Sequence, residues 1–170
     1  MVPYAVLLTL VVATQGAPIT LVAPDGTTST LPAQEITRLP PQAVTVEDRG
    51  NTAAYEGALL TDVLLSLGIP TGEALRGPAA TMVVLVEGKD TAKVSFSAAE
   101  LDPTLSTKRV YLVWRRNGAA LVDAEGPYRI VIPDEKRAVR WVRGVHTVSL
   151  GVAARPVKVV AVKKTQTKTP

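Results

Sequence analysis

Residues 125–150 read EGPYRIVIPDEKRAVRWVRGVHTVSL, and this stretch places a strongly basic segment between two apolar runs. The run YRIVIP, residues 128–133, is apolar except for Arg129 and is typical of a buried strand. The run VHTVSLGV, residues 145–152, alternates apolar and polar side chains, as a strand with one buried face does. We therefore predict two strands joined by a basic turn, residues 133–145, which contains Trp141.

The cationic side chains of this basic turn recur at a regular spacing. Arg137, Arg140 and Arg143 are three residues apart, so on a helical or 3₁₀-like turn they would share one side. Arg129 and Lys136 approach from the preceding strand and turn. Because converging guanidinium groups grip phosphate or carboxylate through paired hydrogen bonds, the basic turn is a candidate anion site.

The same segment also admits an interpretation without a ligand. Runs of charge usually face water, and Asp134 and Glu135 could neutralise the turn locally. Arg140 would then pair with one of these two carboxylates, and Trp141 would anchor the turn in the core. The spacing alone leaves both interpretations open.

Around this stretch the chain reads as short strands separated by turn chemistry. Asp25-Gly26 and Asn117-Gly118 are hairpin turn signals, because these residues accept a positive φ. Further strands are predicted at residues 43–48, 81–88 and 92–97, and a helix within residues 55–70 ends at Gly68. Ser97 and Glu100 have the spacing of a capping box at the start of a second short helix. The fold class is α+β, rich in β structure.

Length and composition limit the function classes. A chain of 170 residues corresponds to about one domain, and no P-loop or dinucleotide-binding glycine fingerprint is present. The net charge of +4 comes from the last part of the chain, where residues 155–170 hold five cations and no acid. The rest of the chain, with 14 cations and 15 acids, is close to neutral, and seven aromatic residues offer little for base stacking. We expect no nucleic-acid partner.

The N-terminus has the layout of a secretory signal peptide. The apolar run AVLLTLVVA, residues 5–13, is followed by small residues but lacks a cation before it. The run is too short to span a bilayer. We predict a signal peptide over residues 1–17, a folded domain over residues 18–152, and a basic C-terminal segment over residues 153–170 whose end is disordered. The mature protein would be periplasmic or secreted, without a transmembrane span.

Several catalytic chemistries lack the residues they need. The chain has no cysteine and one histidine, His146, which the alternation places in a strand as a structural residue. A Ser-His-Asp triad has no recognisable nucleophile elbow. Glu56, Glu87 and Glu125 each precede a glycine, and we interpret all three as turn residues. No catalytic residue and no metal ligand are predicted.

Three separated segments together carry a family resemblance. Residues 125–150 contain a G-P-x-R-x-x-x-P pattern followed by a cation and tryptophan, residues 55–64 contain Y-x-G-x-x-L-x-D-x-L, and residues 95–101 read SFSAAEL. In this order they resemble the oxidoreductase molybdopterin-binding domain family, the fold of the sulfite oxidase catalytic core. The matched positions of the first two segments are Gly126, Pro127, Arg129, Pro133, Arg140 and Trp141, and Tyr55, Gly57, Leu60, Asp62 and Leu64.

The resemblance implies a molybdenum site that this chain cannot complete. Family enzymes hold the metal through the pterin dithiolene and one protein cysteine, which here would fall near residues 45–57. Glu47 and Asp48 offer hard oxygen donors, which differ in kind from a thiolate. A second departure is Asp90-Thr91-Ala92, where small relatives often have Asp-Gly-Tyr. We therefore predict that this chain does not turn over substrate by itself.

The resemblance implies that the basic turn contacts the pterin. Arg140, beside Trp141, would hold its phosphate or its ring edge. The candidate binding residues for a molybdopterin-type pterin, or another anionic small molecule, are Arg129, Lys136, Arg137, Arg140, Trp141 and Arg143. The alternative hypothesis is a module without enzymatic activity that engages a protein partner in the cell envelope.

Overall fold

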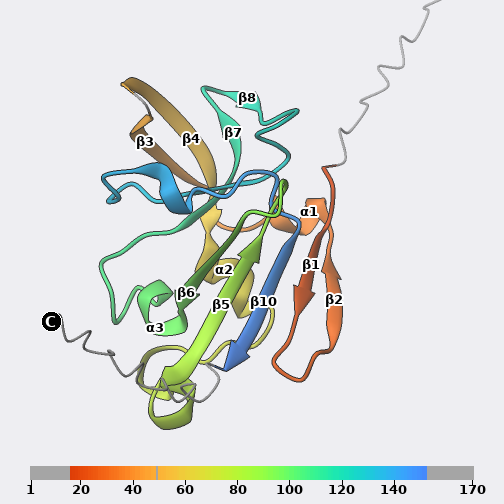
Figure 1. The fold of residues 1–170 in the computed structure, drawn as a ribbon, viewed down its shortest axis with the longest axis vertical. Helices are drawn as coiled ribbons and strands as arrows, with labels where there is room; N and C mark the ends of the chain where they lie inside the picture. The colour runs from red at the N-terminus through yellow and green to blue at the C-terminus, as the bar shows by residue number, and fades with distance from the viewer. Residues whose placement is uncertain (1–15, 49, 153–170) are drawn as a thin grey trace, which may run out of the picture.

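The computed structural model describes residues 16–48 and 50–152, which form two β-sheets (Figure 1). The first sheet has the strand order β2-β1-β10-β5-β6. Its only parallel pair among these strands is β1 with β10, and the other neighbours are antiparallel. The strand bounds are β1 Ile19–Val22, β2 Thr28–Leu31, β5 Met82–Glu87, β6 Lys93–Ser97 and β10 Thr147–Val152.

The second sheet contains β9, the strand that leads into the basic turn. Its order is β3-β4-β7-β8, and β9 also pairs with β7, all antiparallel. The register of β4 on β7 shifts between Glu56 and Gly57, which marks a β-bulge. The strand bounds are β3 Gln42–Asp48, β4 Asn51–Leu59, β7 Tyr111–Arg116, β8 Ala119–Ala120 and β9 Arg129–Val131.

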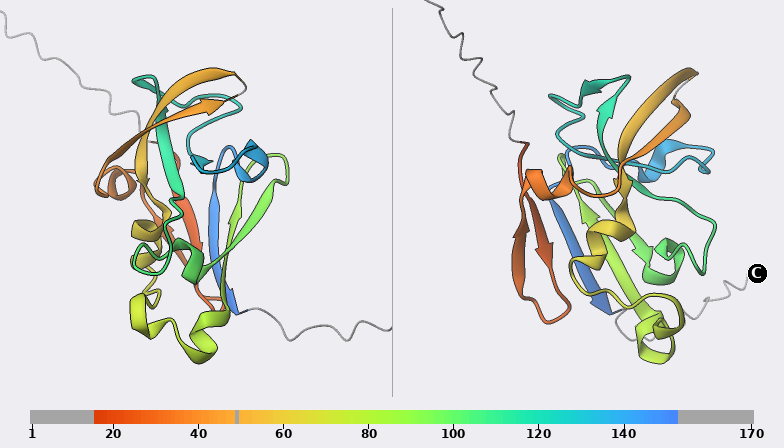
Figure 2. Two further views of the ribbon diagram at one scale, coloured as in Figure 1. Left: turned by 90° about the vertical axis from the view of Figure 1, so that its left-hand side faces the viewer. Right: turned by 180° about the vertical axis from the view of Figure 1, so that it is seen from behind.

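Short helices connect the two sheets. In Figure 1, α2 lies behind β5 and β10, and Figure 2 shows the two sheets from the side and from behind. α2 buries Leu60, Val63 and Leu64. The helix bounds are α1 Ala33–Ile36, α2 Leu60–Leu65, α3 Ala98–Leu101, and the 3₁₀ turns η1 Gly72–Ala74, η2 Gly77–Thr81 and η3 Ala138–Arg140. Within the described residues, no helix has the length and apolarity needed to cross a membrane.

Most of the local predictions are confirmed, because they rest on local backbone chemistry. Gly26 has φ of 84°, and Asn117 and Gly118 have φ of 50° and 79°, as a tight hairpin turn requires. Ser97 Oγ accepts a hydrogen bond from the Glu100 amide at 3.0 Å and caps α3. The α+β, β-rich class is thus confirmed. The predicted signal peptide up to residue 15 and the basic segment 153–170 lie outside the described residues.

Two boundaries differ from the predictions. The helix within residues 55–70 is only α2, because residues 55–59 continue β4 and pair with β7. His146 lies before β10 and is exposed, so its placement in a strand was wrong. Its Nε2 donates to the Gly88 carbonyl at 3.1 Å, and its Nδ1 lies 2.9 Å from Thr147 Oγ1. The ring therefore bridges β10 to the end of β5, which is a structural role.

A buried carboxylate ties α3 to η1. Asp102 is 2% exposed and accepts hydrogen bonds from the Gly72 amide at 2.5 Å and from the amide and hydroxyl of Thr104 at 2.7 and 2.6 Å. Burial by itself would raise the pKa of Asp102, but these hydrogen bonds outweigh burial and hold the pKa below its usual value.

Asp102→Asn is expected to lower the free energy of unfolding by about 1–2 kcal/mol, because a neutral amide replaces a charged acceptor. The contribution of a carboxyl with a lowered pKa is full above its unfolded pKa of about 3.9 and is lost as pH falls toward the folded value. Urea unfolding at pH 7 and pH 3 measures both effects. An equal loss at the two pH values would contradict the charged role of Asp102.

Candidate functional site

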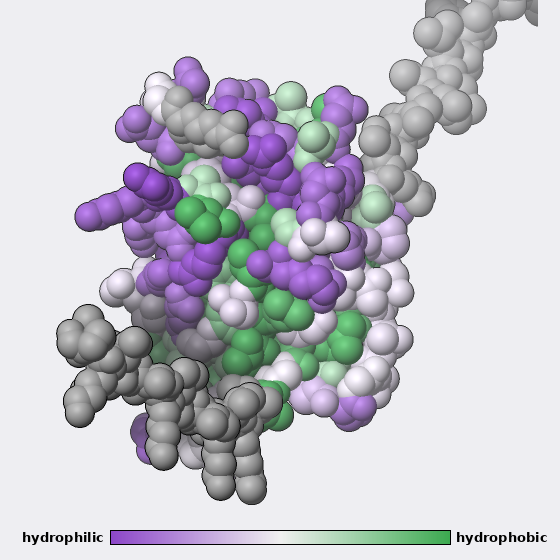
Figure 3. Space-filling view, viewed as in Figure 1, coloured by the Kyte–Doolittle hydropathy of each residue, from purple (hydrophilic) through white to green (hydrophobic). Residues whose placement is uncertain are grey.

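The basic turn forms one wall of an open pocket of about 370 Å³. The opposite wall includes Glu47, near the end of β3, in the segment where the family resemblance places the metal-binding cysteine. In Figure 1 the basic turn, in blue, lies beside β3 and β4. Figure 3 shows hydrophilic side chains over this upper part of the molecule, whereas apolar side chains gather lower down, over β5 and β10. The full lining of the pocket is Glu47, Glu135, Lys136, Arg137, Ala138, Val139 and Trp141.

Lys136 and Arg137 are the cations that the structure presents to this basic-turn pocket. Both side chains are exposed, and neither forms an ion pair with any residue in the described ranges. η3 begins directly after these two cations: Arg137 has an extended backbone, and Ala138 is the first residue of the 3₁₀ turn. The two cations are therefore available to an anionic ligand.

Trp141 supplies a buried donor to the same pocket. The side chain is 7% exposed, and its ring meets the Tyr55 ring edge to face at a centroid distance of 6.4 Å. Its Nε1 is buried and has no hydrogen-bond partner among the described residues. Since a buried indole N–H nearly always finds an acceptor, this atom is an unsatisfied donor in a residue that lines the pocket.

Arg129 is buried in the core rather than exposed in the pocket. It is 1% exposed, and its guanidinium lies 5.7 Å from the Tyr55 ring centroid and 5.2 Å from that of Trp141. Its Nη1 donates to the Tyr55 hydroxyl at 3.0 Å and to Glu125 Oε1 at 3.2 Å. Arg129 thus holds the two aromatic rings in place behind the pocket.

Glu125 is the carboxylate that sequence reasoning missed. It pairs with Arg129 and also with Arg116, whose Nη1 lies 3.6 Å from Glu125 Oε2. Glu125 lies in a turn, as predicted, and in addition it holds these two guanidinium groups. Glu125 is only four residues from Arg129 in the sequence. Because Arg129 lies in the extended strand β9, however, this spacing alone does not bring the two side chains together, and the fold does.

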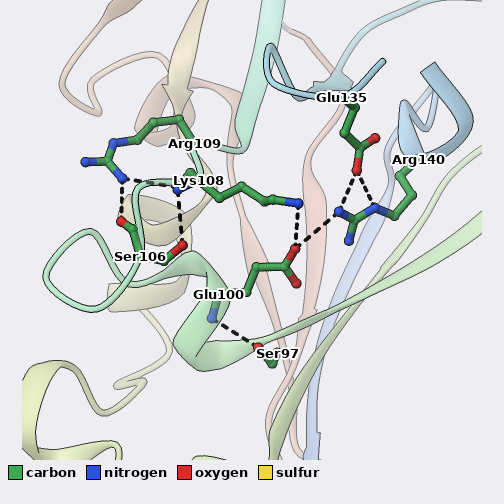
Figure 4. A network of polar contacts seen from close by, with 7 residues as sticks. All are labelled: Ser97, Glu100, Ser106, Lys108, Arg109, Glu135 and Arg140. Atoms are coloured by element: carbon green, nitrogen blue, oxygen red, sulfur yellow. Dashed lines mark hydrogen bonds and ion pairs between the residues drawn. The ribbon is translucent and has the colours of Figure 1, made fainter. Parts of the chain in front are cut away.

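Arg140 is held by two carboxylates (Figure 4). Its Nε donates to Glu135 Oε1 at 2.6 Å, and its Nη2 lies 3.2 Å from Glu100 Oε1. Burial by itself would raise the pKa of Glu100, but hydrogen bonds from Lys108 and Arg140 outweigh it and lower that pKa. The pairing with Glu135 agrees with the interpretation without a ligand, and Glu100 adds a partner 40 residues away in sequence.

Arg143 lies outside the pocket lining. The residue is half-buried and forms an isolated β-bridge with Arg129, and its carbonyl accepts a hydrogen bond from the Lys89 amide at 3.0 Å. The structure therefore brings Lys136, Arg137 and Trp141 together at one pocket. It places Arg129 and Arg140 behind or beside that pocket, each with carboxylate partners.

The loop that departs from the family pattern is conformationally unusual. Asp90 and Thr91 have φ of 57° and 59°, in the left-handed region that glycine adopts most readily. A β-branched threonine is disfavoured there, so the loop holds a backbone that glycine would adopt more readily than Thr91 does.

The donor set does not fit a protein-bound molybdenum of the sulfite oxidase kind. The chain contains no cysteine, and the described residues contain no group of three or more His, Cys, Asp or Glu side chains placed to hold a metal. Glu47 and Glu135 line the pocket, but carboxylates are hard ligands and do not replace a thiolate. Beside these two carboxylates, the lining offers the cations Lys136 and Arg137.

Two sheets, short helices and a basic turn between β9 and β10 define a sulfite-oxidase-type domain. The family model for the oxidoreductase molybdopterin binding domain matches residues 27–155, and the chain belongs to this family. A search of curated proteins found no match.

Among solved structures, the fold is similar to that of the sulfane dehydrogenase SoxCD from Paracoccus pantotrophus, with a TM-score of 0.58 and 20% sequence identity. The match covers 81% of this chain and 38% of that chain, so this protein spans about two fifths of that structure's length. At this identity the likeness shows the fold.

Proposed function

We propose that this domain is an exported module that binds an anionic, pterin-type ligand in the basic-turn pocket and does not turn over substrate by itself. The observation that carries the proposal is the buried Trp141 Nε1, which lacks a partner among the described residues and sits beside Lys136 and Arg137. Family membership supports a molybdopterin-type ligand in particular. The apolar run of residues 5–13 supports export to the periplasm or outside the cell.

Each residue has a separate part in this proposed binding. Lys136 and Arg137 supply positive charge for a phosphate or ring oxygen, and Trp141 donates its N–H to an acceptor. Arg129 orients the Tyr55 and Trp141 rings from behind. Arg140 keeps η3 in position through Glu135 and Glu100, so its part is indirect. When bound, the pterin would supply the dithiolene, and the chain offers no thiolate to complete a metal site.

A second candidate function is a module without enzymatic activity that binds a protein partner in the cell envelope. The observation that favours it is the internal neutralisation of Arg129 and Arg140 by carboxylates. Two of the predicted ligand cations are then structural residues, and a protein surface with acidic side chains could use Lys136 and Arg137 instead.

Native mass spectrometry with metal analysis tests the proposal on the full chain, made in an export-competent host that synthesises molybdopterin. We expect a stoichiometric pterin mass in the wild type. Lys136→Ala with Arg137→Ala is expected to weaken retention by about tenfold per lost charged hydrogen bond. The matched control is Arg76→Ala, an exposed cation paired with Glu73 and remote from the pocket lining.

A wild-type mass without pterin would overturn the pterin assignment and favour the protein-binding module. Equal binding of the pterin by the wild type and the Lys136→Ala, Arg137→Ala variant would overturn the assignment of the ligand to the basic-turn pocket. A pterin that persists in the Arg76→Ala control and is lost in the double variant supports the proposal.

A further inference from the structure

A second, larger pocket of about 700 Å³ lies beside β7 and β8 and shares no lining residue with the basic-turn pocket. It is enclosed by α1 and the following loop on one side and by β7, β8 and residues 121–128 on the other. We call it the β7–β8 pocket. Its lining includes Glu56, Trp114, Arg115, Ala120, Leu121 and Tyr128.

The walls of the β7–β8 pocket are aromatic and apolar. Trp114, Leu121 and Tyr128 are each buried to more than nine tenths and belong to the core, so they form a rigid surface. The Leu121 amide donates to the Trp114 carbonyl at 2.9 Å, which holds the segment after β8 against β7. Rigid aromatic walls around a volume of several hundred Å³ are the usual setting of a small-molecule site.

A tyrosine hydroxyl without a protein partner among the described residues belongs to the lining of this pocket. Tyr128 is 2% exposed, and its hydroxyl forms no hydrogen bond with any described residue. Burial raises the pKa of Tyr128, so the hydroxyl stays protonated at neutral pH and can donate.

Charge at the rim of the pocket is balanced. Arg115 Nη1 and Glu56 Oε2 lie 4.0 Å apart, and both side chains are about half exposed. An ion pair this exposed contributes little to the stability of the fold. Its two opposite charges offset each other, so the rim has no net charge that would attract a charged ligand. The ligand chemistry indicated is therefore an uncharged body with a hydrogen-bond acceptor.

We infer that the β7–β8 pocket binds an uncharged small molecule with a flat apolar body and a carbonyl-type oxygen that accepts from the Tyr128 hydroxyl. The apolar body packs against Trp114 and Leu121, and the acceptor replaces the hydrogen bond that the protein leaves unmade. This site is independent of the basic-turn pocket and of the proposed pterin ligand.

Titration of the full chain with 4-(trifluoromethyl)benzamide, followed by fluorine NMR, tests the inference. This probe has a flat apolar ring and an amide carbonyl. We expect saturable binding in the millimolar range or tighter. Tyr128→Phe is expected to weaken binding about fivefold, the effect of one neutral hydrogen bond. Ala120→Trp, at an exposed position of the lining, is expected to abolish binding by filling the pocket.

The matched control for Ala120→Trp is Ala119→Trp, the neighbouring exposed residue of β8, which is outside the lining. A fluorine signal that shifts linearly without saturation would overturn the inference. So would equal binding by the Ala119→Trp and Ala120→Trp variants, or loss of binding in the Lys136→Ala, Arg137→Ala variant. The last variant separates this site from the proposed function, because it leaves every β7–β8 lining residue intact.

Discussion

Gly57→Ala is expected to lower the free energy of unfolding by at least about 3 kcal/mol, at the upper end of overpacking costs. Gly57 lies at the β-bulge where β4 crosses β7. A Cβ there would fall well inside van der Waals contact of the Leu112 carbonyl oxygen and 2.5 Å from Val113 Cα. Because both contacts are to backbone, no side chain can move aside, and the two strands must separate.

Urea unfolding followed by circular dichroism measures this loss, and Gly151→Ala is the matched control. Gly151 lies in β10, and a Cβ at that position would meet no atom within 4 Å. We expect Gly151→Ala to change the midpoint of unfolding little. A Gly57→Ala variant as stable as Gly151→Ala would show that the bulge between β4 and β7 has room for a methyl group.

Glu125→Ala is expected to cost about 3 kcal/mol of unfolding free energy, because it removes a carboxylate partner from a buried guanidinium. Arg129 is 1% exposed and would keep the Tyr55 hydroxyl as an acceptor, but its charge would be less well compensated. Arg129→Met should cost less, since it removes the buried charge and leaves Glu125 paired with Arg116.

A double-mutant cycle on Glu125→Ala and Arg129→Met, measured by chemical denaturation, gives the coupling between the two side chains. Glu73→Ala is the control: this carboxylate pairs with Arg76 in solvent, so its loss should cost less than about 1 kcal/mol. If Glu125→Ala costs no more than Glu73→Ala, the pairing of Glu125 with Arg129 does not stabilise the fold.

The structural role of Arg129 also bears on the binding hypothesis. A cation that is already neutralised and stacked between two aromatic rings contributes to a pocket mainly by fixing its walls. Loss of ligand in an Arg129 variant would therefore be difficult to separate from loss of fold. Lys136 and Arg137 are the cleaner test positions, because their side chains are exposed and carry no ion pair with described residues.

The sequence by itself determined the local structure and the family. Strand alternation, the positive φ at Gly26 and Gly118, and the Ser97 cap depend on neighbouring residues, and so they can be predicted from short segments. The basic turn was also visible as a cluster of cations around Trp141.

Only the tertiary structure decided which of these cations can meet a ligand. Glu100 reaches Arg140 from 40 positions away and Tyr55 reaches Arg129 from 74, so no local pattern contains these pairings. The β7–β8 pocket likewise joins α1 to β7, which lie far apart in sequence. Periodicity and turn chemistry act over a few residues, whereas a charged side chain takes the partner that the packed fold brings within hydrogen-bonding distance.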